Sequence, residues 1–181
     1  MICIGFGTNE KLYSKVICWA SRSDWSHTWI EYPSGVWGGR WAIHATPDGL
    51  IKVPLERVHA RYTRRKAYEC KCDLEEGFKW GRQHVSAEYD YGVIWNLILL
   101  VLLRATGWVW LWEMVARNLS KYSCSEYVMG FLKAAGVFTT DNERLFLETT
   151  GVMGATRVDP ELTTPGDLER FCEVSDDFQA L

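Results

Sequence analysis

A cysteine at the start of a predicted helix is the strongest chemical signal in this sequence. Ser123 and Glu126 have the spacing of a capping box, in which each side chain accepts a hydrogen bond from the other residue's backbone N–H. This places Cys124 at the first helical residue, where the helix dipole and free backbone N–H groups favour a thiolate. A backbone N–H beside the sulfur can also stabilise an oxyanion. The spacing therefore predicts that Cys124 is a nucleophile.

Two histidines on neighbouring predicted strands supply a base and a group to orient it. His27 lies in a predicted strand at 26–32 and His44 in one at 40–46. We expect an antiparallel pair with His27 opposite His44, which also sets Glu31 against Arg40. Both imidazoles then share one face of the sheet. If the cysteine helix packs on that face, a Cys124–His27–His44 triad follows, with His44 holding His27 in place.

The same residues also have a purely structural interpretation. A histidine on a strand is more often a hydrogen-bonded polar residue than a catalyst. In a reduced protein, most cysteines are buried as small hydrophobic residues. A structural cysteine would more naturally lie in the middle of the helix, within its apolar stripe, than at its first residue.

Four short segments, in order along the chain, resemble the circularly permuted NlpC-type, papain-like cysteine hydrolases. SHTWIEY resembles that family's Ser-His-Val-Gly-Ile strand, with Thr28 and Trp29 in place of small residues. The Ile-His-Ala triplet ending at Ala45, together with the later Val-Pro-Leu, resembles the next two strands. YSCSEYV resembles the Tyr-x-Cys-Ser-Glu-Leu-Val motif, and TTPGDLER is similar to a Ser-Pro-Gly-Asp-Leu ending. His44 departs from the glutamate common in permuted members and is similar to the second histidine of unpermuted ones.

The resemblance implies an α+β, papain-like fold in permuted order, with an antiparallel sheet packed against the helix that carries Cys124. It also implies a thiol amidase or peptidase that cleaves amide bonds in the peptides of bacterial cell walls. Two alternatives remain open. One is a hydrolase or acyltransferase for lipid amides and esters, and the other is a non-catalytic, papain-like binding component of a phage particle.

Two tyrosines are further candidates for the site. Tyr91 belongs to a Tyr-Asp-Tyr segment that resembles an element before the cysteine helix in the family, and Tyr122 precedes Cys124 by two residues. Either could line a substrate pocket or donate a hydrogen bond to an oxyanion. A packed aromatic ring with its hydroxyl at the surface is an equally good interpretation of both.

The segment 93–116 is unusually apolar and contains four tryptophans. Its unbroken apolar run is shorter than the roughly 20 residues of a membrane span, and Arg104 and Gly107 interrupt it. It is either a buried helix or a helical hairpin insertion that contacts a protein partner or a lipid surface.

Composition narrows the remaining possibilities. The chain has 181 residues, 48% hydrophobic, with a net charge of −3, which predicts one packed domain, 1–181, without a nucleic-acid footprint. The N-terminus lacks a signal-peptide pattern, so we expect synthesis in the cytoplasm, with incorporation into a virion an open possibility. Six cysteines are then expected to be reduced. Cys70 and Cys72 have no second ligand pair nearby, so neither a metal nor another cofactor is predicted.

The predicted elements alternate short strands with helices. Strands are expected at 1–8, 26–32, 40–46, 50–55 and 66–72, and helices at 9–21, 73–87, 123–135 and after Thr164. In the first helix, Leu12, Val16, Ile17 and Ala20 form the face that is expected to enter the core. Asp73 and Glu76 are a predicted capping pair for the second helix.

Overall fold

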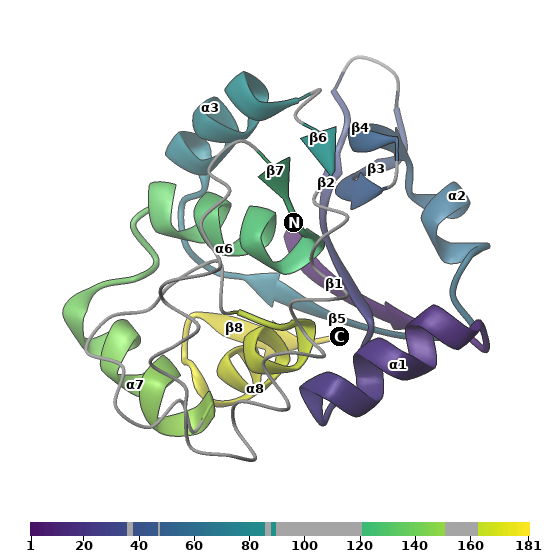
Figure 1. The fold of residues 1–181 in the computed structure, drawn as a ribbon. Coiled ribbons are helices and arrows are strands. Elements are labelled where there is room, and N and C mark those ends of the chain that lie inside the picture. The colour runs from purple at the N-terminus through teal and green to yellow at the C-terminus, as the bar shows by residue number, and fades with distance from the viewer. Residues whose placement is uncertain (36–37, 47, 86–87, 90–120, 151–162) are drawn as a thin grey trace.

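The computed structural model describes residues 1–35, 38–46, 48–85, 88–89, 121–150 and 163–181. These residues form an α+β fold with a six-stranded antiparallel sheet (Figure 1). The strand order across the sheet is β4-β3-β2-β1-β5-β8. The segment 93–116 lies outside the described residues, as does Tyr91.

Most predicted elements form within a few residues of their expected bounds. The strands of the sheet are β1 (Ile2–Thr8), β2 (His27–Pro33), β3 (Arg40–Thr46), β4 (Gly49–Pro54), β5 (Arg64–Cys70) and β8 (Phe178–Ala180). The described helices are α1 (Leu12–Ser21), α2 (Leu55–His59), α3 (Glu75–His84), α6 (Cys124–Ala134), α7 (Thr140–Thr150) and α8 (Pro165–Val174). A separate pair of very short strands, β6 (Glu88–Tyr89) and β7 (Lys121–Tyr122), runs parallel just before α6. The helices α2 and α7 and the strand β8 have no counterpart in the sequence prediction.

The predicted capping box is confirmed at the start of α6, and the one predicted for α3 is wrong. The box of Ser123 with Glu126 forms. The last helix begins at Pro165, as expected, and a second box, of Thr164 with Asp167, which was not predicted from the sequence, caps it. The predicted pair at the start of α3 does not form, because Leu74 is the N-cap. Asp73 instead accepts a hydrogen bond from the backbone N–H of Glu75 at 3.0 Å.

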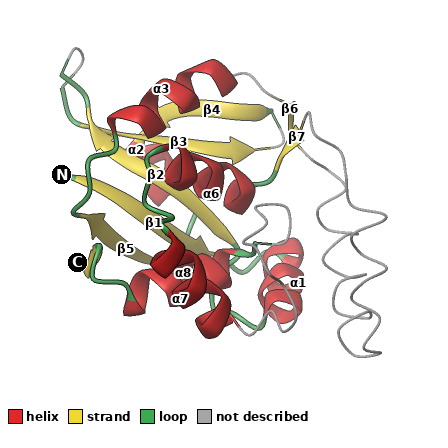
Figure 2. Ribbon diagram, turned by 90° about the vertical axis from the view of Figure 1, so that its left-hand side faces the viewer, coloured by secondary structure: helices red, strands yellow, loops and turns green. Residues whose placement is uncertain are grey.

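The larger core lies on one face of the sheet, which we call the core face. Ile30 and Ile43 contribute to it from the sheet, and buried side chains of α6 such as Val128 and Phe131 pack against them. Figure 2 shows α3, α6, α7 and α8 gathered on the viewer's side of the sheet. The helix that carries Cys124 therefore packs against an antiparallel sheet.

The opposite face, which we call the polar face, has a smaller apolar cluster. Trp29 and Ala42 of the sheet pack there against Leu55 and Val58 of α2. Strand alternation places His27, Trp29 and Glu31 on this face, because successive side chains point to opposite sides. The two faces are thus covered by different helices, α6 on one and α2 on the other (Figure 1).

The predicted register of the β2–β3 hairpin is wrong by two residues. The observed pairs run from Ile30 with Ile43 to Pro33 with Arg40, so that His27 is not opposite His44. Gly38 and Gly39 both have positive φ, 65° and 69°, and belong to the connecting turn. A shift of two residues leaves every side chain on its original face. Both imidazoles therefore still share one face.

The expected orientation of α1 is confirmed for Ile17, which is buried, and wrong for Leu12. Leu12 is 78% exposed, whereas Ser14 and Ser21 are buried. The inward serines are satisfied by hydrogen bonds: Ser14 Oγ lies 2.5 Å from Ser26 Oγ and 3.1 Å from Thr8 Oγ1. Within the described residues, no helix combines the length and the apolar composition needed to cross a bilayer.

Candidate active site

The two predicted histidines are in direct contact. His27 Nε2 lies 3.0 Å from His44 Nδ1, with the ring planes at 76°. His27 is the first residue of β2, and His44 lies near the last residue of β3. Because the two strands are antiparallel, both histidines lie at the same end of the strands. A single proton lies between these two nitrogen atoms, and the Nδ1 atom of His27 is not part of this hydrogen bond. If His27 donates that proton, its Nδ1 is free to act as a base.

An aromatic stack holds the His27 ring. The Tyr62 ring is parallel to His27, with centroids 5.2 Å apart and planes at 11°, and it stacks on Trp29 at 5.5 Å. Tyr62 belongs to the connection between α2 and β5, and no sequence motif marked it. Its role depends on the fold of α2, which brings this connection over the polar face.

Both imidazoles are neutral in this environment. Burial lowers the pKa of His27 well below its usual 6.5, and the neighbouring His44 and the Arg61 guanidinium lower it further. Burial, with a smaller effect of Arg61, lowers the pKa of His44 to about 4. A neutral imidazole can accept a proton, which is the first requirement of a general base.

Cys124 lies near the same end of the strands as the two histidines. Its helix, however, covers the core face of the sheet, and the histidines lie on the polar face. The condition set for the triad, that the cysteine helix packs on the face of the imidazoles, is not met, because the apolar stripe of α6 packs on the apolar core face. The first residue of α6 nevertheless reaches the start of β2. The backbone N–H of Thr28, the residue after His27, points to the Cys124 sulfur, as does the N–H of Ser125.

The ionisation of Cys124 differs from the sequence prediction. Its side chain is 7% exposed. Burial raises its pKa to about 11, although the N–H groups of Thr28 and Ser125 act in the opposite direction. The desolvation cost of a thiolate therefore outweighs the stabilisation by the helix start. At neutral pH the Cys124 thiol is therefore neutral, like both imidazoles. Contact between the Cys124 sulfur and a His27 ring nitrogen stays a prediction.

A second polar group extends along the polar face from the histidines. Glu31 is 4% exposed and accepts a hydrogen bond from Trp29 Nε1 at 2.8 Å. Its Oε2 atom pairs with Arg40 at 3.1 Å, and His59 Nε2 lies 3.7 Å from its Oε1 atom, the one that accepts from Trp29. The predicted pairing of Glu31 with Arg40 is confirmed, although Ala42 and not Arg40 lies directly opposite Glu31.

The remaining residues to consider are the two candidate tyrosines and the five other cysteines. Tyr122 lies in β7, two residues before Cys124, and Tyr91 is outside the described residues. All six cysteines lie in described parts of the chain and are thiols, with no disulfide. In those parts, no three His, Cys, Asp or Glu side chains gather closely enough to hold a metal ion.

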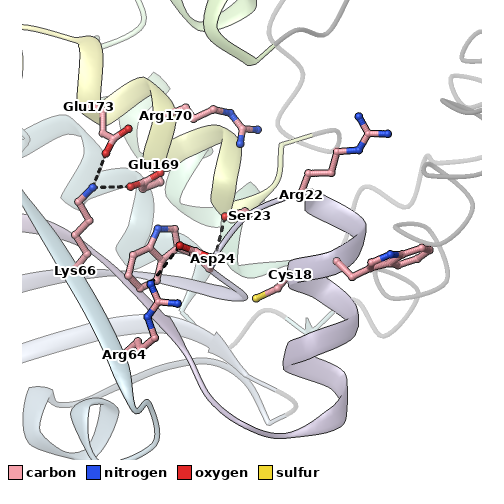
Figure 3. A pocket seen from close by; sticks show the side chains of 11 residues that line it. Cys18, Arg22, Ser23, Asp24, Arg64, Lys66, Glu169, Arg170 and Glu173 are labelled. Carbon is pink, nitrogen blue, oxygen red and sulfur yellow. Dashed lines mark hydrogen bonds and ion pairs between the residues drawn. The ribbon is translucent and has the colours of Figure 1, made fainter.

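A pocket of about 890 Å³ lies between α1, α8 and β5, and none of the three candidate catalytic residues lines it (Figure 3). Ion pairs close one side of it: Lys66 bonds to Glu169 at 2.7 Å and to Glu173 at 2.6 Å. Arg64 pairs with Asp24 at 3.2 Å. This pocket is separate from the Cys–His residues and has no part in the chemistry considered for them.

Comparisons with known proteins bear on the fold. No protein-family model matches the sequence, and no curated protein matches it. The structure is similar to the crystal structure of metalloprotein yiiX from Escherichia coli O157:H7, described as DUF1105. The TM-score is 0.59 at 15% identity, over 99% of this chain and 94% of the other. At this identity the similarity shows a shared fold alone.

Proposed function

We propose that this protein is a thiol hydrolase that cleaves amide bonds, with Cys124 as nucleophile, His27 as base and His44 as the residue that orients His27. The observation that carries the proposal is that the Cys124 sulfur and the histidine pair both lie near the start of β2. There the Thr28 N–H faces the Cys124 sulfur, while the adjacent His27 bonds to His44. The resemblance of the same segments to permuted, papain-like hydrolases supports the fold and the substrate class.

The proposed reaction begins from the neutral thiol. His27 Nδ1 removes the thiol proton as the sulfur attacks the amide carbonyl, and the Nε2–H of His27 donates to His44 throughout. In this proposal the backbone N–H of Cys124, in the open first turn of α6, stabilises the oxyanion. The leaving amine takes the proton from His27, which leaves a thioester. Water then attacks the thioester, His27 accepts its proton, and the carboxylic acid is released as the thiol re-forms.

The structural neighbour is called a metalloprotein, and that description concerns the neighbour alone. Among the residues described for this chain, no group of three or more His, Cys, Asp or Glu side chains could hold a metal ion. The proposed mechanism therefore includes no step through a metal ion. Peptides of the bacterial cell wall are the proposed substrates, and lipid amides and esters are the second class to be tested.

The test compares the products that wild type and Cys124→Ala form from peptidoglycan fragments and from lipid extracts, by mass spectrometry. We expect turnover to fall by at least about a thousandfold in Cys124→Ala, because the nucleophile is lost. Cys18→Ala is the matched control, since Cys18 is a half-buried thiol on α1, outside the proposed site. Equal turnover by Cys124→Ala and wild type would refute the proposal. The absence of turnover in wild type on both substrates would favour the non-catalytic alternative.

The raised pKa of Cys124 gives a second test. With a pKa near 11, the thiolate fraction rises about tenfold for each pH unit from 7 to 10. The rate of alkylation of Cys124 by iodoacetamide should rise in the same proportion, measured by peptide mass spectrometry. A rate that does not change over this range would show a preformed thiolate–imidazolium pair, and the base-assisted step above would be wrong.

A further inference from the structure

The helix α1 places two serines toward the protein interior and large apolar side chains toward the solvent. Its inward side is formed by Ser14, Ile17 and Ser21, which are 8% exposed or less. On its outward side, Leu12 is 78% exposed and Trp19 is 66% exposed. Leu12 and Trp19 are seven residues apart, which is two helical turns, and Val16 lies between them on the same side. An exposed apolar row of this kind usually marks an interaction surface.

The surroundings of this row are basic, although the chain as a whole has a net charge of −3. On α1 and in the segments bonded to it are four basic side chains and two carboxylates: Lys11, Lys15, Arg22 and Arg64, with Glu10 and Asp24. The carboxylates are used by Lys15 and Arg64, at 2.9 and 3.2 Å. The pocket beside Trp19 and Arg22 adds Arg170 and Lys66 with Glu169 and Glu173, and Lys66 is paired with both of these carboxylates.

Two of the basic side chains are left for an external anion. Among the residues that the structure describes, Lys11 and Arg22 have no carboxylate partner. Figure 3 shows the Arg22 guanidinium directed away from the ion pairs of Lys66 with Glu169 and Glu173. Arg22 follows the last turn of α1, and Lys11 precedes its first turn, so unneutralised cations stand at both ends of the apolar row.

We propose that the outward face of α1, formed by Leu12, Val16 and Trp19, docks on a membrane surface that contains anionic phospholipid. Trp19 and Tyr13 are residues that favour the boundary between water and lipid, and Leu12 would enter the acyl region. The basic side chains at both ends of the row would lie at the depth of the phosphates. This docking is independent of the catalytic proposal, because none of these residues belongs to the candidate site.

The charge arrangement favours lipid over a protein groove. An apolar row bordered by basic side chains that lack carboxylates matches a continuous anionic surface, in which a phosphate is available next to every cation. The helix has only ten residues and lies flat on its own domain, with its serine side hydrogen-bonded inward. It can therefore enter an interface to a shallow depth without leaving the fold.

The test is co-sedimentation of the full chain with vesicles of equal parts phosphatidylcholine and phosphatidylglycerol, and with vesicles of phosphatidylcholine alone. We expect binding to the anionic vesicles that high salt weakens, and weaker binding to the neutral ones. Leu12→Ser combined with Trp19→Ser should lower the partition coefficient at least about tenfold, because most of the inserting apolar surface is removed. Both side chains are exposed, so the melting temperature should stay within a few degrees of wild type.

Two further variants make the test specific. Lys11→Glu combined with Arg22→Glu should weaken binding to anionic vesicles and leave the weak binding to neutral vesicles unchanged. Leu181→Ser is the matched control, because Leu181 is 63% exposed at the C-terminal end of the chain, beside β5, and should bind like wild type. Wild type that binds neither vesicle, or a Leu12/Trp19 variant that binds like wild type, would overturn the proposal. So would a variant that loses only self-association in light scattering, since α1 would then be a contact between copies of the chain.

Discussion

The two faces of the central sheet are closed by different forces. On the core face, Ile30, Ile43 and the buried side chains of α6 meet in apolar contacts. On the polar face, a histidine pair, a buried glutamate and Trp29 are held by hydrogen bonds, ring stacking and an ion pair. Apolar packing does not depend on protonation, whereas the polar face depends on the protonation state of its members. The candidate catalytic residues thus combine a rigid apolar support with a face that responds to pH.

The largest effect is expected from a change on the core face. Phe131 of α6 is fully buried and its ring lies edge-on to Phe78, with centroids 5.0 Å apart. Phe131→Ala should lower the free energy of unfolding by about 3–5 kcal/mol, because it removes a large apolar side chain and leaves a cavity. Urea unfolding at pH 6 and pH 8 measures it. A loss that differs strongly between the two pH values would contradict the contrast between the faces.

Acid should weaken the polar face. His44 has a pKa of about 4 in the folded protein and 6.5 when unfolded, so below pH 6.5 the unfolded chain binds a proton that the folded chain does not. The free energy of unfolding is therefore highest above pH 6.5, and it falls as the pH decreases toward 4. The loss amounts to about 3 kcal/mol for this one group.

Thermal unfolding between pH 7 and pH 4 measures this dependence. His44→Gln should reduce the acid-induced loss, with His27 retaining its own part of it, because the pKa of His27 is also lowered. His84→Gln is the control, since His84 lies on α3, away from the polar face. The assignment fails if His44→Gln shows the same acid-induced loss as wild type.

A smaller effect is expected from added volume on the polar face. A Cβ atom at Gly5 would lie 2.2 Å from Trp29 Nε1 and 2.8 Å from Glu31 Oε1. Gly5→Ala must therefore displace the Trp29 ring and its hydrogen bond to Glu31, at a cost of about 1–3 kcal/mol. Gly35→Ala is the matched control, because its Cβ would meet nothing within 4 Å. Equal melting temperatures for the two variants would show that the Trp29 ring has room to move.

The smallest effect is expected when a charge is removed without a change of shape. In Glu31→Gln, the amide oxygen can still accept from Trp29 Nε1, but the ion pair with Arg40 is lost. We expect a loss of about 1 kcal/mol, since Arg40 is partly exposed and water replaces part of the interaction. Urea unfolding at low and high salt measures it. A much larger loss would show that the ion pair is shielded from solvent.

The sequence by itself determined most of the elements and the sheet faces of the strand side chains. The capping box of Ser123 and Glu126 involves residues three apart, so it fixed the position of Cys124 at the start of α6. Strand alternation placed His27 and His44 on a common face whatever the register, because a shift of two residues preserves the face.

Only the tertiary structure decided how these pieces meet. The register depended on the turn that holds Gly38 and Gly39, and the side covered by α6 depended on where its apolar stripe found a matching surface. The outward orientation of α1 depended on partners for Ser14 that lie elsewhere in the chain, Thr8 and Ser26. The neutral state of Cys124 followed from burial, which is a property of all the residues around the thiol and not of its neighbours in sequence.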